Sequence, residues 1–157
     1  MRDFVIDTDC GIDDAVAIMM ALAHPDVRVA GITAVSGNVG VEQVTENVLR
    51  LLSCFGRSDI PVYRGASHAL LQGQVRAASV HGENGLGGLE LAAANAELAQ
   101  ETAPVGLRNL LAAHPGATVV TLGPLTNLAM MLNLFPEAEG NIGRLVCMGG
   151  GVETGNV

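Results

Sequence analysis

The sequence predicts an α/β fold, in which helices cover both faces of an open, mostly parallel sheet. Short apolar, β-rich runs alternate with longer runs of helical periodicity, as in a sheet built with crossover helices. The predicted strands are near-continuously apolar, which is typical of strands covered on both sides. The chain has 157 residues, 49% of them hydrophobic, which is enough for one sizeable core. We therefore expect a single α/β domain over residues 1–157, with a Rossmann-like core.

The elements follow in a regular order. Strands are expected at residues 3–6, 27–35, around 62, 118–122 and 145–148. Helices are expected at residues 13–23, 41–55, 105–114 and 126–135. The first helix is apolar almost all round, which predicts burial on several sides. The Ala/Glu-rich segment 89–103 is expected to form a surface helix or a variable connection.

Charge and composition exclude several classes of partner. The chain carries 16 acidic and 8 basic side chains, a formal charge of −8, and no Lys/Arg run. This balance argues against nucleic acid or an anionic membrane as partner. The longest apolar run, residues 15–23, is about half of what a bilayer crossing needs. Three scattered cysteines and the lack of an export signal at the start predict a cytoplasmic protein with reduced thiols.

The most informative segment holds four carboxylates, those of Asp7, Asp9, Asp13 and Asp14, between an apolar strand and an apolar helix. Such close carboxylates repel one another, and their pKa values rise unless positive charge lies among them. A helix N-terminus offsets only part of this charge. A divalent cation with hard oxygen ligands, Ca²⁺ or Mg²⁺, would offset more of it. The position also suits a binding site, because ligands of open α/β sheets bind beyond the carboxyl ends of the strands.

The acidic segment also has other interpretations. Asp13 or Asp14 could simply cap the helix while the other carboxylates are solvated. An EF-hand loop counted from Asp7 would need Gly and Glu where Ile12 and Ile18 stand. A Mg²⁺-dependent phosphohydrolase of the haloacid dehalogenase type also begins with D-x-D, but it would want Thr or Val at the position of Gly11. It remains the weaker alternative function.

The segment DTDCGIDDAVAI, residues 7–18, resembles the N-terminal signature of the inosine–uridine-preferring nucleoside hydrolase family. Further segments are similar to that family's motifs in the same order, with Ser36 in place of a glycine: residues 35–40, 81–88, 122–129 and 148–156. The resemblance covers the whole chain. Because family members are about twice as long, it implies that this chain is a truncated, N-terminal portion of such a domain.

The resemblance implies an enzyme that cleaves the N-glycosidic bond of ribonucleosides with water, giving ribose and free base, with one bound Ca²⁺. Asp9, Asp14 and the backbone carbonyl of Leu122 would be the calcium ligands. Asp7 would lie behind them and hold the loop. Asp9 would also act as the general base for the calcium-bound water.

The resemblance also implies the substrate contacts. Asp13, Asn38 and Asn156 would bind ribose hydroxyls, and His81 would lie on a mobile loop near the base. It implies a role in purine and pyrimidine salvage and a homo-oligomer, dimer or tetramer, for the full-length protein. Family members supply a further calcium-binding Asp from their other half. A catalytically inactive fragment or subdomain therefore stays open as the alternative.

Overall fold

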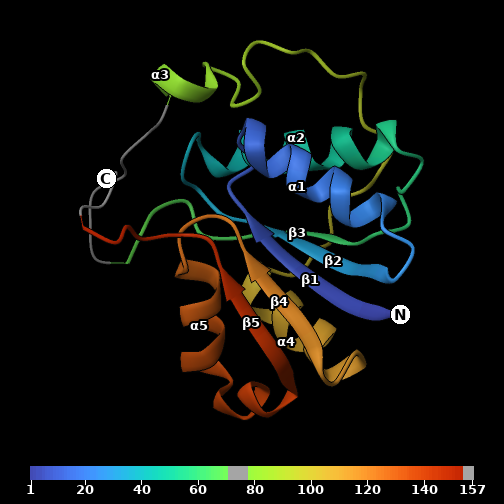
Figure 1. Cartoon of the computed structure of the whole chain (residues 1–157), viewed down its shortest axis with the longest axis vertical. Coiled ribbons are helices and arrows are strands. Elements are labelled where there is room, and N and C mark those ends of the chain that lie inside the picture. Colours follow the sequence, from blue (N-terminus) through green and yellow to red (C-terminus); the bar gives the residue numbers. More distant parts are fainter. Residues whose placement is uncertain (71–77, 154–157) are drawn as a thin grey trace.

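The computed structural model describes residues 1–70 and 78–153. Its centre is a five-stranded parallel sheet in the order β3-β2-β1-β4-β5 (Figure 1). The strands are β1 (Arg2–Thr8), β2 (Val27–Ala34), β3 (Val62–Arg64), β4 (Ala117–Thr121) and β5 (Ile142–Cys147). The parallel sheet that the sequence predicts is therefore confirmed, with strand ends that differ from the expected ones by a few residues.

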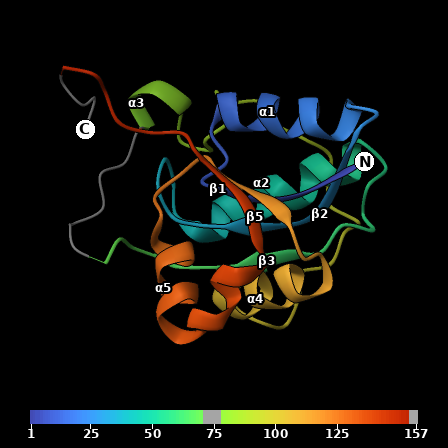
Figure 2. The same ribbon diagram turned by 60° about the horizontal axis from the view of Figure 1, so that its bottom comes forward.

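Helices lie on both faces of the sheet (Figure 2). One face carries α1 (Ile12–Ala23) and α2 (Val41–Cys54), and the other carries α4 (Ala103–Ala113) and α5 (Thr126–Leu134). A short α3 (Ala78–His81) and a 3₁₀ helix, η1 (Pro136–Asn141), complete the described elements. Within the described parts of the chain, none of the helices has both the length and the apolar composition that a bilayer crossing demands.

Two hydrophobic cores hold the layers together, because successive side chains of a strand point to opposite faces. On the first face, Ile6 of β1 packs with Ile18 of α1 and Leu52 of α2. On the second face, Val5 of β1 packs with residues of α4 and α5, among them Leu107 and Met131. β1 therefore contributes to both cores and is the central strand of the fold.

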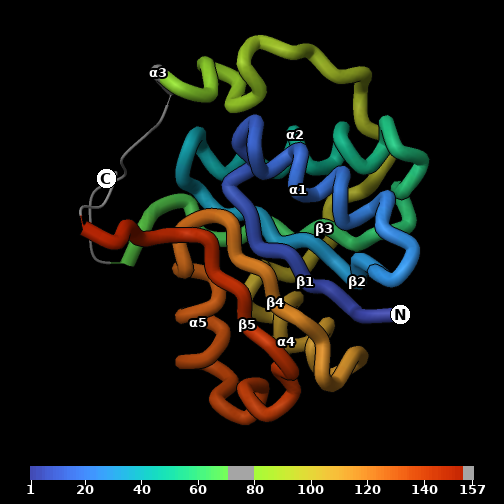
Figure 3. Tube along the Cα trace, in the orientation of Figure 1, coloured from blue at the N-terminus to red at the C-terminus, as the bar shows by residue number. Residues whose placement is uncertain are grey.

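The order of the strands creates a switch point between β1 and β4. From β1 the chain builds outward through β2 to β3, and it then crosses to the other side of β1 for β4 and β5. Figure 3 shows that the segments leaving β1, β2 and β4 emerge at the same edge of the sheet. A crevice between loops that diverge in this way is where open α/β sheets bind ligands.

Two expectations about burial are wrong. Val16 and Met20 of α1 are 45% and 69% exposed, so α1 is not buried on several sides. All residues of β5 after Ile142 are exposed, so helices do not cover both of its faces. The physical reason is that, in the described parts of the chain, Ile142 is the one residue of this edge strand that packs against a hydrophobic core. Two alternatives were expected for the segment 89–103, and the structure shows the connection. It runs up to the start of α4 and makes one isolated β-bridge, between Leu98 and Val62.

We predict that the two sides of α1 respond differently to truncation. Ile18→Ala removes a fully buried side chain and should lower the free energy of unfolding by about 2–5 kcal/mol. Met20→Ala, two residues along the same helix, should change it by less than about 0.5 kcal/mol. Urea unfolding followed by circular dichroism measures both. Equal losses for the two variants would contradict the burial described for α1.

Candidate active site

A three-residue turn, residues 9–11, joins β1 to α1 and carries Asp9. Cys10, in its middle, has a φ of 43°, a left-handed conformation that is uncommon for a residue other than glycine. The turn is held by the Cys10 amide, which donates to Thr8 Oγ1 at 2.9 Å. Burial and the nearby Asp14 and Asp9 carboxylates raise the pKa of the Cys10 thiol, so it stays protonated and is a poor nucleophile.

Asp14 lies in the first turn of α1 with its carboxyl group buried. Its Oδ2 accepts hydrogen bonds from Thr8 Oγ1 at 2.9 Å and from the Gly11 amide at 3.2 Å. Asp14 thus caps the helix, as the simplest interpretation expects. Capping alone does not explain its surroundings, however. Burial and the neighbouring Asp9 carboxyl group raise the pKa of Asp14, so a second acidic group lies against it.

Asp9 is the point at which three loops meet. Its Oδ2 accepts a hydrogen bond from the Asn38 amide at 2.9 Å, in the loop after β2. Gly37 of the same loop lies so close to the Asp9 carboxyl group that it has no room for a side chain. On the other side, a Cβ added at Gly123 would lie 2.9 Å from Asp9 Oδ1. The loops after β2 and β4 therefore enclose Asp9, which is buried.

Leu122 follows β4 at the same edge of the sheet. Its amide donates to the backbone carbonyl of Asp7 at 2.8 Å, which continues the pairing of β1 with β4. Since Gly123 lies beside the Asp9 carboxyl group, the Leu122–Gly123 peptide belongs to the wall of the same site. Leu122, whose carbonyl the family resemblance singles out, is thus the residue before the glycine that lies beside Asp9.

Asp7 lies one step deeper and is fully buried. Its Oδ1 accepts hydrogen bonds from Thr33 Oγ1 at 2.5 Å and Asn127 Nδ2 at 2.8 Å. Burial raises the pKa of Asp7 from 3.8 to about 6, against the opposing effect of these hydrogen bonds. Its Oδ2 and the hydroxyl of Thr121, the residue paired with it on β4, are buried without a hydrogen-bond partner among the described residues.

The residues expected to contact substrate gather around Gly11. A Cβ at Gly11 would lie 2.6 Å from Asn38 Nδ2, 2.9 Å from His81 Cε1 and 3.0 Å from Asp13 Oδ1. The Asp13 side chain is 71% exposed, in keeping with a group that faces a ligand. His81 Nδ1 accepts the Ile12 amide at 3.2 Å and lies 3.9 Å from Asp13 Oδ1. Asn156, the remaining expected contact, lies outside the described residues.

The donor atoms suit a hard cation but do not form a complete shell. No group of three or more His, Cys, Asp or Glu side chains is placed to hold a metal ion within residues 1–70 and 78–153. The carboxylates of Asp9 and Asp14, and backbone carbonyls such as that of Leu122, are oxygen donors of the kind that Ca²⁺ and Mg²⁺ prefer. Ca²⁺ takes six to eight such ligands, so water or a bound ligand would have to add others.

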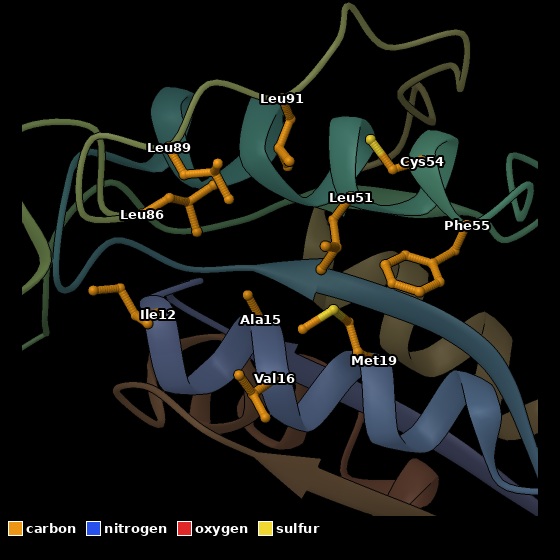
Figure 4. A pocket seen from close by; sticks show the side chains of 10 residues that line it. All are labelled: Ile12, Ala15, Val16, Met19, Leu51, Cys54, Phe55, Leu86, Leu89 and Leu91. Atoms are coloured by element: carbon orange, nitrogen blue, oxygen red, sulfur yellow. The ribbon is translucent and has the colours of Figure 1, made fainter.

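An apolar pocket lies elsewhere, between α1, α2 and the segment that follows α3 (Figure 4). Its lining includes Val16, Met19, Leu51 and Phe55, and all ten lining residues lack carboxyl and amide side chains. It offers nothing to polarise water or bind a sugar hydroxyl. The acidic turn is therefore the candidate active site.

Sequence reasoning missed four contributors to the site. The sequence singles out Asn127 only as part of the motif at residues 122–129, and it places Thr33 inside a predicted apolar strand. A polar residue inside an otherwise buried strand was the available signal for Thr33. Gly37 and Gly123 lie in the motifs at residues 35–40 and 122–129, but only the fold shows that their missing side chains make room for Asp9.

The fold and this site define an α/β protein with a cluster of acidic side chains at the switch point of its sheet. The model of the inosine-uridine preferring nucleoside hydrolase family matches residues 4–157, so the chain belongs to that family. Over 152 residues it is 43% identical to the non-specific ribonucleoside hydrolase RihC of Escherichia fergusonii, covering 96% of this chain and 50% of the relative. The RihC protein of Klebsiella pneumoniae is 44% identical over 154 residues, covering 97% and 50%.

Solved structures agree with the fold. A purine-preferring ribonucleoside hydrolase from Gardnerella vaginalis superposes with a TM-score of 0.89 at 33% identity, covering 96% of this chain and 49% of that one. An inosine-guanosine nucleoside hydrolase superposes with a TM-score of 0.91 at 37% identity, covering 99% and 52%. The chain thus spans about half the length of the relatives it matches.

We predict that, without divalent cations, the buried carboxyl groups make the protein less stable as the pH rises. Because the pKa of Asp7 is raised to about 6, the native state keeps a proton that the unfolded chain loses above about pH 4. The free energy of unfolding should therefore fall between about pH 4 and pH 6, and the raised pKa of Asp14 acts in the same direction.

Urea unfolding in a chelator at several pH values measures this slope. Asp7→Asn should flatten it, whereas substitution of the exposed Asp26 by Asn should leave it unchanged. An identical slope in Asp7→Asn and wild type would contradict the buried, protonated state assigned to Asp7.

Proposed function

We propose that this chain carries the catalytic loop of an enzyme that hydrolyses the N-glycosidic bond of ribonucleosides, giving ribose and free base. The observation that carries the proposal is the meeting of the buried Asp9 and Asp14 carboxyl groups with Asp13, Asn38 and His81 around one turn. Membership of the nucleoside hydrolase family supports it. The names of the relatives also support it, since all those cited above are nucleoside or ribonucleoside hydrolases.

Asp9, Asp14 and the Leu122 carbonyl would hold Ca²⁺ in this enzyme. The proposal is supported by two adjacent buried carboxyl groups that lack a cationic partner among the described side chains. When bound, Ca²⁺ would supply positive charge that makes water easier to deprotonate and holds it in place. Asp7 would remain behind the ligands and fix the strand that carries Asp9.

Asp9 would act as the general base. The Asn38 amide holds its Oδ2, so we assign Oδ1, on the Gly123 side, to take a proton from water. The water oxygen would form the new bond to the anomeric carbon as the N-glycosidic bond breaks. The leaving base would take the electron pair of that bond and a proton from solvent, and Asp9 would return to solvent the proton that it took from water. Negative charge around the sugar would stabilise the oxocarbenium-like transition state.

Asp13 and Asn38 would bind ribose hydroxyl groups, with Asn156 adding a third contact. Groups placed to bind two hydroxyls reject a sugar that lacks one of them, because buried donors and acceptors would be left unpaired. His81 would lie near the base. Its side chain is packed against the start of α1, so its ring is already held close to Asp13.

The alternative is an inactive fragment, and two observations favour it for the chain alone. Within residues 1–70 and 78–153, no group of three or more His, Cys, Asp or Glu side chains is placed to hold a metal ion. The chain also spans about half of its relatives. Family membership favours N-glycosidic hydrolysis over the Mg²⁺-dependent phosphohydrolase.

For the full-length protein we propose a cytoplasmic homo-oligomer, dimer or tetramer, acting in nucleoside salvage. Three free cysteines suit a reducing compartment.

Substitution at the acidic turn should abolish most of the activity of the full-length enzyme. We expect Asp9→Asn and Asp14→Asn each to lower kcat by about 10²- to 10⁴-fold, since each removes a carboxylate from the reacting centre. Release of reducing sugar from inosine, uridine and cytidine measures the rate, and circular dichroism checks folding. Asp59→Ala, on an exposed side chain, is the control. Wild-type rates in either variant would remove that residue from the mechanism.

Cation binding should be visible without activity. Addition of Ca²⁺ should raise the thermal unfolding midpoint at pH 7.5 and raise it less at pH 5, because protons compete for the carboxylates. Asp14→Asn should abolish the increase, and the Asp59→Ala control should keep it. An increase that is equal at both pH values and insensitive to Asp14→Asn would place the cation elsewhere.

A further inference from the structure

We infer that Asn127 is a positioning residue that locks the strand ends beneath the proposed site and thereby holds Asp9 and Asn38 in place; this inference rests on the proposed function. Asn127 is fully buried in the first turn of α5, directly after the loop that follows β4. It touches neither the expected ribose contacts nor the proposed cation ligands in any described hydrogen bond. Its effect on the reaction is therefore indirect.

The Asn127 side chain makes three hydrogen bonds to described residues, and each of them reaches the end of a different strand. Its Nδ2 donates to Asp7 Oδ1 at 2.8 Å, in β1, and to the carbonyl of Ala34 at 2.9 Å, at the end of β2. Its Oδ1 accepts the amide of Ala66 at 2.9 Å, just after β3. One amide side chain thus joins the carboxyl ends of β1, β2 and β3 to the segment that leaves β4. Figure 1 shows these ends at one edge of the sheet.

The bond to Ala66 continues into the site. Ser36 lies in the loop after β2, and its amide donates a hydrogen bond to the Ala66 carbonyl at 2.9 Å. Within that loop the Gly37 amide donates to the Val39 carbonyl at 3.2 Å, and the Asn38 amide donates to Asp9 Oδ2 at 2.9 Å. A short series of hydrogen bonds therefore runs from Asn127 to the carboxylate assigned as the general base.

The packing around Asn127 leaves no room for adjustment. A Cβ at Gly65 would collide with both terminal atoms of the Asn127 amide and with the Ala34 carbonyl. The backbone turn before Ala66 therefore lies directly against the amide. This close fit is a second observation, independent of the hydrogen bonds, that the position of Asn127 fixes the path of the chain after β3.

The chemistry of the contacts requires an amide. A carboxylate at position 127 could still accept the Ala66 amide, but it could not donate to Asp7 or Ala34. It would also place a second acidic group against the buried Asp7 carboxyl. The neighbours of Asp7 on the sheet, Thr33 and Thr121, are both neutral, so nothing among them would offset the added charge.

The test uses the full-length protein and the variant Asn127→Asp. We expect kcat for ribonucleoside hydrolysis to fall by about 10- to 100-fold, as for a displaced catalytic group. We also expect the Ser36 and Asn38 amides to exchange hydrogen at least about 10-fold faster, while the amide of Ile18 in the core keeps its protection. Asn133→Asp makes the same change at an exposed position of the same helix, and it should alter neither quantity.

The double variant Asp7→Asn/Asn127→Asp restores an amide–carboxylate pair with the two groups exchanged. We expect it to regain part of both the rate and the protection of Asn38. Unchanged rate and exchange in Asn127→Asp would overturn the inference. So would a double variant that recovers wild-type stability with no recovery of exchange protection at Asn38, because the role of Asn127 would then be structural only.

Failure of the proposed function has a separate signature. If the wild-type protein releases no ribose, the exchange rates of Ser36 and Asn38 still report whether Asn127 positions the loop. Faster exchange confined to that loop would support the positioning role without the nucleosidase reaction, and unchanged exchange would overturn it.

Discussion

The burial of three carboxyl groups at the end of the central strand is the constraint on which the rest of the site depends. Asp7, Asp9 and Asp14 lie within one strand, one turn and the first turn of one helix, and all are shielded from solvent. The protein compensates partly with neutral donors, from Thr8, Thr33, Asn127 and two backbone amides. Neutral donors do not remove the repulsion between Asp9 and Asp14. The cation that we propose would offset that repulsion, and the proposed chemistry makes use of the same charge.

The fold places this charge where a ligand can reach it. Parallel strands bring their carboxyl ends to one edge, and the reversal between β1 and β4 separates the loops there. Glycines at positions 37 and 123 let two of these loops close on Asp9. Asp13 and Asn38 then lie at the more exposed side of the turn, which gives the site a buried acidic floor and an accessible polar rim.

Sequence alone could predict the sheet, the main helices and the acidic turn, because hydrophobic periodicity and charge spacing are local properties. It could not predict the contacts of Asn127 with Asp7 and Ala66, which are separated by 120 and 61 positions along the chain. The sequence also predicted too much burial for α1 and β5. An apolar pattern indicates that a segment tends to be buried, but it does not say which other segment packs against it. Val16, Met20 and most of β5 are exposed in the described parts of the chain, which spans about half of its relatives.

A crystal structure of the full-length protein grown with Ca²⁺ and a ribose-containing inhibitor would test the central claim most directly. The account predicts one ion at about 2.3–2.6 Å from oxygens of Asp9, Asp14 and the Leu122 carbonyl, with sugar hydroxyls completing its shell. Asp9 and Asp14 turned away from each other, with the inhibitor bound and no ion between them, would contradict it.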